Sequence, residues 1–245
     1  MSKPYKYIFF DLDHTLWDFD SNSSEVLREL YFTYDLGKYG IESADLFLER
    51  FVQTNNALWA KYNVGEIDKF YLRNQRFRLV FEDAGAIMTL VEEMFLKEFN
   101  KQFLHHSPRK SKLMDGAIEV LEALHGHYKM FIITNGFEEV QSIKMAHSKI
   151  DHYFDRIITS EKAGFKKPFA GIFNYAMKWT GANPEESIMI GDNLEADIKG
   201  ARDYGMDQIY YNPAGIAHNE SVTHEIKNLT EILAIMDHLA AVKNG

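Results

Sequence analysis

The fold of this chain is decided by one stretch near its start, Tyr7-Ile8-Phe9-Phe10-Asp11-Leu12-Asp13-His14-Thr15-Leu16. The first four residues form a short, continuously apolar run, which is the pattern of a strand buried on both faces. Asp11 and Asp13 follow, and in an extended backbone residues two apart project to the same side. Two carboxylates in one small volume repel each other unless a cation lies between them or one holds a proton. The stretch therefore indicates a reaction centre, although a polar turn with Asp13 capping a helix is an alternative.

The composition of the 245 residues is that of an ordinary globular protein, with 46% hydrophobic and 26% charged residues. The net charge is −9, from 27 basic and 36 acidic residues. This balance argues against a protein that coats nucleic acid or binds an anionic membrane. We therefore expect no nucleic-acid polymer and no membrane as a partner. A small anionic substrate needs local cations or a metal ion to reverse the sign inside its site.

Several chemistries are excluded by residue type. The chain has no cysteine, which excludes thiol catalysis, disulfides and cysteine zinc sites. It begins Met-Ser-Lys-Pro-Tyr-Lys, without an apolar signal segment. No window approaches the roughly 18 apolar residues that suggest a transmembrane helix. We expect a cytoplasmic protein.

The segment 17–112 has helical character throughout. Apolar residues recur at helical spacing in four runs, at about 21–36, 43–62, 67–81 and 87–103. No strand-like run interrupts them, and the polar and basic residues 105–112 are typical of a linker. The arginines at 73, 76 and 78 are expected on the solvated face of the third helix, with Phe70, Phe77 and Phe81 turned inward.

After the linker, helices alternate with short apolar strands. The expected strands are 130–133, 156–158, 187–190 and 208–211, separated by helices at about 116–127, 138–149, 169–179, 195–204 and 228–239. This alternation predicts an α/β fold, a Rossmann-like parallel sheet with helices on both faces. Residues 1–16 and 113–245 would form this domain, and 17–112 an all-helical cap inserted after the first strand. An insertion there leaves from the sheet edge that binds ligands, which makes it a candidate lid.

Polar groups follow four of the strands. They are Asp11 with Asp13, Thr134-Asn135-Gly136, Lys166-Lys167-Pro168, and Gly191-Asp192-Asn193-Leu194-Glu195-Ala196-Asp197. Read singly, most have a simpler explanation. Thr-Asn-Gly is a common turn, a lysine pair is commonly solvated, and acids are favoured at a helix start by its dipole.

Their joint arrangement carries more information, because parallel strands present their carboxyl ends at one edge of the sheet. Three acids, a lysine and a hydroxyl–amide pair should therefore converge. Three carboxylates together call for a hard divalent cation, and Mg²⁺ is held by a few carboxylates, waters and phosphate oxygens. Acids, Mg²⁺, a lysine and backbone donors around one pocket are what phosphoryl transfer requires.

These motifs resemble those of the haloacid dehalogenase-like hydrolases. Asp11-Leu12-Asp13-His14-Thr15, Thr134, Lys167-Pro168 and Gly191-Asp192 with Asp197 match the four motifs of that family in order and with typical spacing, and the helical block matches its cap. The resemblance implies that Asp11 is a nucleophile forming an aspartyl-phosphate, and that Asp13 is the general acid and base.

The same resemblance implies the remaining roles. Thr134, Asn135 and Lys167 would bind phosphate, with Lys167 also neutralising the nucleophile. Mg²⁺ would be held by Asp11, the main-chain carbonyl of Asp13, and Asp192. Asp197 would orient Lys167 or the waters of the metal ion.

The acid at position 13 distinguishes branches of the family, because dehalogenases generally lack an acid there and need neither metal nor leaving-group acid. Its presence indicates a phosphatase. The segment Leu58-Trp59-xx-Tyr62-xx-Gly65-x-Ile67 and the arginine-rich helix after it resemble the YjjG-type pyrimidine 5'-nucleotidases. This resemblance implies a pyrimidine nucleoside 5'-monophosphate as substrate, and a monomer or weak homodimer is expected.

Three alternatives stay open. The substrate could be a sugar phosphate or another small phosphate ester. The chain could instead be a phospho-accepting signalling module resembling receiver domains, although these are about half this length and carry no inserted cap. A binding protein that retained the fold without activity is the third alternative.

Overall fold

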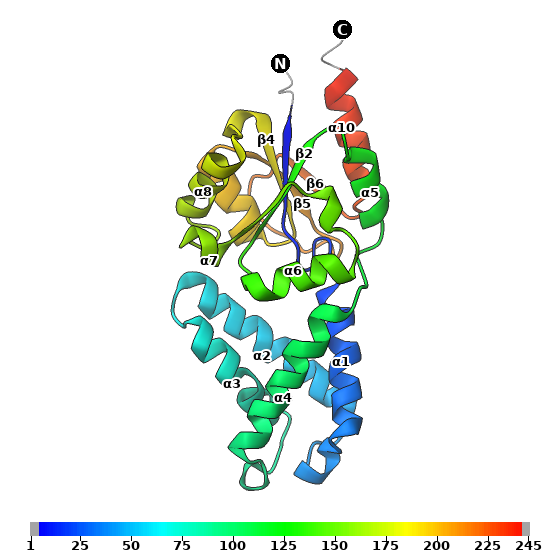
Figure 1. Ribbon diagram of the computed structural model, residues 1–245, viewed down its shortest axis with the longest axis vertical. Helices are drawn as coiled ribbons and strands as arrows, with labels where there is room; N and C mark the ends of the chain where they lie inside the picture. The colour runs from blue at the N-terminus through cyan, green and yellow to red at the C-terminus, as the bar shows by residue number, and fades with distance from the viewer. Residues whose placement is uncertain (1–4, 242–245) are drawn as a thin grey trace. The chain divides into compact units, whose positions relative to one another are not determined.

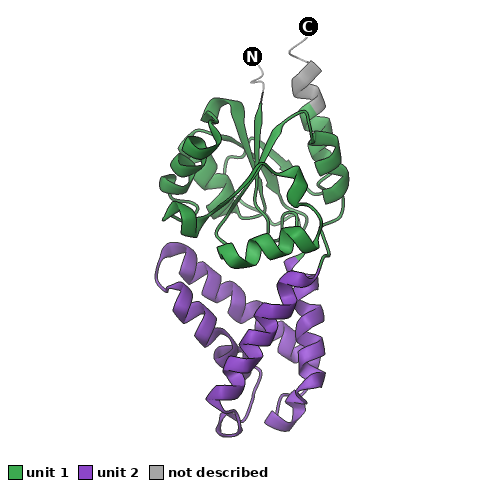
Figure 2. Ribbon diagram, in the orientation of Figure 1, with its two compact units in different colours: residues 1–18, 111–245 green, residues 19–110 purple. Residues whose placement is uncertain are grey.

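The computed structural model describes residues 5–241, with side chains up to residue 236. Residues 1–4, where the sequence predicts no apolar segment, lie outside the described residues. The chain divides into two compact units, residues 1–18 with 111–245 (unit 1) and residues 19–110 (unit 2; Figure 2). Within the described part, no helix is both long and apolar enough to cross a bilayer.

Unit 1 is built on a six-stranded sheet whose neighbouring strands all pair in parallel. The strands run in the order β3-β2-β1-β4-β5-β6. Their bounds are Tyr7–Phe10 (β1), Lys129–Thr134 (β2), Arg156–Thr159 (β3), Ser187–Gly191 (β4), Asp207–Tyr211 (β5) and His224–Ile226 (β6). The predicted parallel sheet is confirmed. The sequence reading missed β6, a three-residue strand too short to show a pattern.

Strand β1 occupies the centre of this sheet. Phe10 is in register with Ile132 of β2 on one side and Ile190 of β4 on the other. The strand order reverses here, because the chain continues to β2 and β3 on one side and later to β4, β5 and β6 on the other. Open α/β sheets bind ligands at the carboxyl ends of the strands beside such a reversal. Asp11 follows β1 at that position.

Helices cover both faces of the sheet, as predicted. Helix α8 (Ala170–Thr180) packs against α9 (Gly200–Tyr204), and both contribute to a core cluster with Phe9, Phe131 and Met189. Helices α5 (Ala117–Leu124) and α10 (Glu231–Ala241) lie on the opposite side (Figure 1). Three further elements connect strands: α6 (Glu138–His147), α7 (Ser160–Ala163) and a π-helical segment, η6 (Leu194–Lys199).

Unit 2 consists of four helices and short 3-10 turns. The helices are α1 (Phe19–Thr33), α2 (Ala44–Val64), α3 (Lys69–Asp83) and α4 (Glu93–His106). Ser43 and Asp68 cap the starts of α2 and α3 by accepting hydrogen bonds from Leu46 and Tyr71 backbone N–H groups. The core between the helices is rich in phenylalanine, with members such as Phe47, Phe77 and Phe99 at most 1% exposed.

The expected orientation of α3 is partly wrong. Arg76 is only 4% exposed, whereas Phe70, expected inward, is 75% exposed. The buried stripe of α3 includes Leu72, Arg76 and Val80, which are spaced by four residues and share a face. The Arg76 guanidinium lies over the rings of Phe51, Phe77 and Phe103 and donates a hydrogen bond to Asn100 at 3.3 Å. Cation–π contacts thus replace the solvent expected around Arg76.

The two chain segments that lead into and out of unit 2 pair with each other inside unit 1. The Asp18 N–H donates to the Lys112 carbonyl at 3.1 Å, and the Met114 N–H donates to the Leu16 carbonyl at 2.9 Å. The Lys112 ammonium and the Asp18 carboxylate form an ion pair at 3.1 Å. The points where the chain leaves and re-enters unit 1 are therefore neighbours.

Candidate active site

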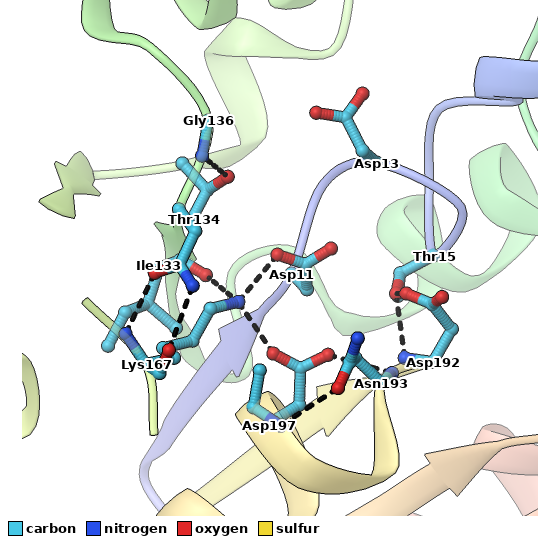
Figure 3. A network of polar contacts seen from close by, with 12 residues as sticks. Asp11, Asp13, Thr15, Ile133, Thr134, Gly136, Lys167, Asp192, Asn193 and Asp197 are labelled. Atoms are coloured by element: carbon cyan, nitrogen blue, oxygen red, sulfur yellow. Dashed lines mark hydrogen bonds and ion pairs between the residues drawn. The ribbon is translucent and has the colours of Figure 1, made fainter. Parts of the chain in front are cut away.

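The centre of the site is a buried ion pair at the tip of β1 (Figure 3). Lys167 Nζ donates hydrogen bonds to Asp11 Oδ1 and Asp197 Oδ1, each at 2.6 Å, and to the Ile133 carbonyl at 2.8 Å. An ammonium has three donors, so all three are used. Burial alone would lower the Lys167 pKa, but the charges of Asp11 and Asp197 outweigh it and raise the pKa. Lys167 is therefore a fixed, buried positive charge beside Asp11.

Asn135 holds the backbone of Lys167. Its side-chain amide donates to the Lys167 carbonyl at 2.9 Å, and its side-chain oxygen accepts from the Lys167 N–H at 2.8 Å. The direct phosphate contact that the family resemblance implies for the Asn135 side chain would compete with these two hydrogen bonds. The observed contacts make Asn135 the residue that aligns the β2 tip with the Lys167 loop.

The acids of the site lack enough positive charge. The pKa of Asp11 is raised to about 7, chiefly by burial and also by the carboxylates of Asp197 and Asp13, while Lys167 opposes the rise. Burial also raises the pKa of Asp192 well above its ordinary value, helped by the charges of Asp11 and Asp197. One lysine therefore does not neutralise this group. A further cation would relieve the repulsion.

The donor set fits a hard divalent cation. One oxygen each from Asp11, Asp192 and Asp197 lie within 4.8 Å of one another, and carboxylate oxygens are the ligands that Mg²⁺ prefers. The three carboxylates differ in what already binds them. Asp197 accepts from Lys167 through Oδ1 and from the Asn193 N–H through Oδ2 at 3.0 Å, so it is mainly committed to Lys167. Asp11 and Asp192 are the better candidate ligands.

A turn after β1 brings Thr15 to Asp192. His14 has a φ of 63°, which ends the extended run, and the Leu12 carbonyl accepts from the N–H groups of Leu16 and Trp17. The Thr15 hydroxyl donates to Asp192 Oδ1 at 2.9 Å and accepts from the Asp192 N–H at 3.1 Å. This reciprocal pair fixes the tip of β4 against the loop after β1. The sequence reading assigned Thr15 no such function.

Gly191 is required for a reason that the sequence does not show. The Gly191 backbone is not in the left-handed region, so a turn that only glycine can make is not the reason. Instead, a Cβ at position 191 would lie 2.3 Å from Asp197 Oδ2. The missing side chain makes room for the Asp197 carboxylate, which the π-helical η6 carries back toward Lys167.

Asp13 faces helix α6. Its Oδ1 accepts from Lys144 Nζ at 2.5 Å and its Oδ2 from the Gln141 side-chain amide at 2.9 Å. In Figure 3 the Asp13 carboxylate points away from Asp11. Burial would raise the Asp13 pKa, but Lys144, together with the Gln141 hydrogen bond, lowers it overall. Lys144 and Gln141 thus favour the carboxylate form of Asp13.

Thr134, at the end of β2, is the remaining predicted residue. Its hydroxyl oxygen accepts from the Gly136 N–H at 3.0 Å and from the Gln141 side-chain amide at 2.9 Å. The sequence does not reveal Gln141 and Lys144, because they lie within an ordinary helical pattern. Their only signal is that two polar residues three apart share one helix face.

The fold and this geometry define a class: α/β proteins in which an aspartate pair, a lysine and a threonine lie at the carboxyl edge of a parallel sheet. The chain belongs to the haloacid dehalogenase-like hydrolases, whose sequence profile matches residues 8–211.

Relatives span nearly the whole chain. The chain is 30% identical to pyrimidine 5'-nucleotidase PynA of Streptococcus pneumoniae, covering 95% of each protein. It is 31% identical to pyrimidine 5'-nucleotidase YjjG of Escherichia coli, covering 92% of this chain and 97% of that one. The magnesium-bound crystal structure of YfnB from Bacillus subtilis superposes with a TM-score of 0.84 at 27% identity, covering 96% of this chain and all (100%) of that one.

Proposed function

We propose that this chain is a Mg²⁺-dependent phosphatase that hydrolyses a small phosphomonoester through an aspartyl-phosphate on Asp11. The observation that carries the proposal is the Lys167 ammonium held 2.6 Å from both Asp11 and Asp197 at the tip of the central strand. A buried carboxylate beside a fixed cation is a suitable nucleophile for an anionic phosphoryl group.

In the first step, an Asp11 oxygen attacks phosphorus in line with the leaving oxygen, and the bond from phosphorus to that oxygen breaks. Asp13 carries the proton that it takes from water in the second step of each turnover, and it gives that proton to the leaving alkoxide. The Thr134 hydroxyl and backbone N–H groups of the loop after β2 hold the phosphoryl oxygens. Lys167 stays hydrogen-bonded to Asp11 and offsets its charge.

In the second step, Asp13 accepts a proton from water, and the water oxygen attacks phosphorus. Asp11 leaves as a carboxylate and inorganic phosphate is released. The ion pair with Lys144 favours the charged form of Asp13, which is the form that accepts this proton.

Asp11, Asp192 and the Asp13 carbonyl would hold the metal ion, with Asp197 kept for Lys167. When bound, Mg²⁺ supplies positive charge that offsets the phosphoryl oxygens and the acids around them.

The substrate that we propose is a pyrimidine nucleoside 5'-monophosphate. Two relatives named pyrimidine 5'-nucleotidase support it, since each matches more than nine tenths of the chain. The acid at position 13 supports phosphate ester rather than carbon–halogen chemistry, because an alkoxide leaving group needs a proton and a halide does not.

The proposal is tested with Asp11→Asn, assayed on an aryl phosphate with Mg²⁺. Turnover should fall below detection, because the amide is a poor nucleophile, and EDTA should abolish wild-type activity. The matched control is Asp155→Asn, which removes a half-exposed carboxylate paired with Lys129 and should leave turnover unchanged. Substantial activity in Asp11→Asn, or full wild-type activity in EDTA, would refute the mechanism.

A screen of phosphate release tests the substrate separately. Pyrimidine nucleoside monophosphates should give the highest kcat/KM among nucleotides and sugar phosphates. A preference for sugar phosphates, or a flat profile, would reject the nucleotidase assignment and leave the phosphatase mechanism standing.

A further inference from the structure

Helix α6 contributes two buried polar side chains that connect Asp13 with Thr134. Gln141 is fully buried (0% exposed) and Lys144 is 4% exposed. The two hydrogens of the Gln141 side-chain amide go to Asp13 Oδ2 and to Thr134 Oγ1, each at 2.9 Å. Lys144 Nζ reaches the other oxygen of Asp13 at 2.5 Å. Burying such groups costs free energy unless their partners are well placed.

Gln141 determines the direction of the Thr134 hydroxyl. A hydroxyl oxygen has two acceptor lone pairs and one donor hydrogen. The Gly136 N–H and the Gln141 amide occupy both lone pairs of Thr134. The hydrogen of Thr134 must therefore point away from these two groups, so that Thr134 meets an incoming ligand only as a donor. A phosphoryl oxygen carries only acceptors and matches it.

The backbone is shaped to admit Gln141. A Cβ at Gly136 would lie 1.8 Å from Gln141 Nε2 and 2.5 Å from its side-chain carbonyl carbon. Gly136 is not in the left-handed region, so the requirement for glycine here is space. The loop after β2 is thus built around the Gln141 side chain.

Lys144 has an aromatic contact in addition to its ion pair with Asp13. Its ammonium lies 4.4 Å from the centre of the Trp17 ring, a cation–π contact that supports a charge removed from solvent. The aromatic contact leaves Lys144 directed at Asp13.

We propose that Gln141 and Lys144 are positioning residues of the phosphatase reaction: Gln141 makes Thr134 a dedicated donor to the phosphoryl group, and both residues hold Asp13. The inference rests on the proposed function, and it assigns to α6 a part in the reaction beyond covering the sheet.

The first test is Gln141→Met, which keeps the volume and removes both hydrogen bonds, alongside Gln141→Glu, which keeps the shape but, when protonated beside Asp13, has a single donor hydrogen that the Asp13 carboxylate takes in preference to Thr134. In both variants the inhibition constant of inorganic phosphate should rise about tenfold, because the Thr134 hydroxyl is no longer restricted to donating its hydrogen bond to the ligand. The kcat should also fall. The matched control is Gln208→Met, another buried glutamine whose partners are Met206 and Thr223. It should lower the thermal midpoint without changing phosphate inhibition.

The second test is Lys144→Met, assayed on aryl phosphates whose leaving groups differ in pKa. Here kcat/KM, which reports the first step and not the hydrolysis of the aspartyl-phosphate, should fall about tenfold or more for poor leaving groups and little for good ones, because Asp13 is no longer held to protonate the leaving oxygen. Phosphate inhibition should stay near the wild-type value, and Lys144→Arg should recover part of the loss. If Lys144 had a purely structural role, its loss would lower the rate for all substrates equally.

The outcomes separate the two proposals. An inactive wild type overturns the proposed function and this inference together. An active wild type with Gln141→Met and Gln141→Glu unchanged in phosphate inhibition, or Lys144→Met unchanged in its dependence on the leaving group, overturns the inference alone. If Gln141→Met does not fold, the isosteric Gln141→Glu decides.

Discussion

At the scale of single residues, Gly191 shows how an absent side chain positions a present one. Gly191→Ala would push a methyl group to 2.3 Å from Asp197 Oδ2, displacing the carboxylate that holds Lys167. We expect the free energy of unfolding to fall by about 1–3 kcal/mol, as for other overpacked sites, and turnover to fall with it. Chemical denaturation and an aryl phosphate assay measure the two effects.

The control for this prediction is Gly37→Ala. Gly37 is also outside the left-handed region, and its nearest neighbours to an added Cβ are 3.8 Å away or more. It should be close to neutral. Equal stability losses in the two variants would show that Gly191 is not required for the space it leaves.

The raised pKa of Asp11 predicts how stability varies with pH in the metal-free protein. The folded-state pKa is about 7, against an ordinary value of 3.8, so the folded protein holds this proton more tightly than the unfolded chain. The stabilisation is therefore complete below the ordinary value and is lost as pH rises through about 7. Denaturant titrations should show the free energy of unfolding falling across this window.

Asp11→Asn should reduce that pH dependence, because the amide does not titrate and its loss also relieves the repulsion that raises the Asp192 pKa, while Asp155→Asn should keep it. Saturating Mg²⁺ should also flatten it in the wild type, because a bound cation favours the charged carboxylates. An unchanged slope in Asp11→Asn would contradict the assignment.

At the scale of elements, η6 depends on its cap. Asn193 Oδ1 accepts from the Ala196 N–H at 2.8 Å where η6 begins. Asn193→Ala should cost about 1 kcal/mol of stability and lower kcat, because η6 carries Asp197 toward Lys167. Ser43→Ala removes the comparable cap of α2 in unit 2 and should give a similar shift in denaturation midpoint with kcat unchanged. Equal kcat values in the two variants would separate η6 from catalysis.

The elements also show what a sequence can predict. Apolar runs and helical spacing were sufficient for the parallel sheet and the helical block. The meeting of Asp11, Thr134 and Asp192 at one edge follows from the parallel topology, whereas Lys167 lies beyond α7 and is brought there by the two hydrogen bonds with Asn135. What was missed depends on partners distant in sequence.

Three features of the structure are not visible in the sequence pattern. Gln141 and Lys144 lie in a regular helix, and only the position of Asp13, more than 120 residues earlier, gives them a function. Arg76 was expected on the solvated face of α3 because it is charged. In the structure, aromatic rings on α2 and α4 pack against its guanidinium. Gly136 and Gly191 are needed because they leave space for other side chains, and which side chains occupy that space is seen only in the folded structure.

At the scale of the whole molecule, unit 1 should fold without unit 2. The Asp18 N–H donates a hydrogen bond to the Lys112 carbonyl, so the two ends of the insertion are close together. Residues 19–110 can therefore be replaced by a short Gly/Ser linker. The shortened chain should unfold cooperatively, and Mg²⁺ at a hundred times its Kd should stabilise it by about 2.7 kcal/mol. Asp192→Asn should abolish this stabilisation. A shortened chain that folds but gains nothing from Mg²⁺ would place the metal site elsewhere.

The paired segments at residues 16–18 and 112–114 have one more consequence. They anchor both ends of a 92-residue excursion to the same spot, and the entropy of closing a loop grows only slowly with its length. Unit 1 should therefore tolerate inserted domains of very different size between residues 18 and 111. Exchange of the inserted domain would then change substrate preference, while the chemistry at the carboxyl edge of the sheet stays the same.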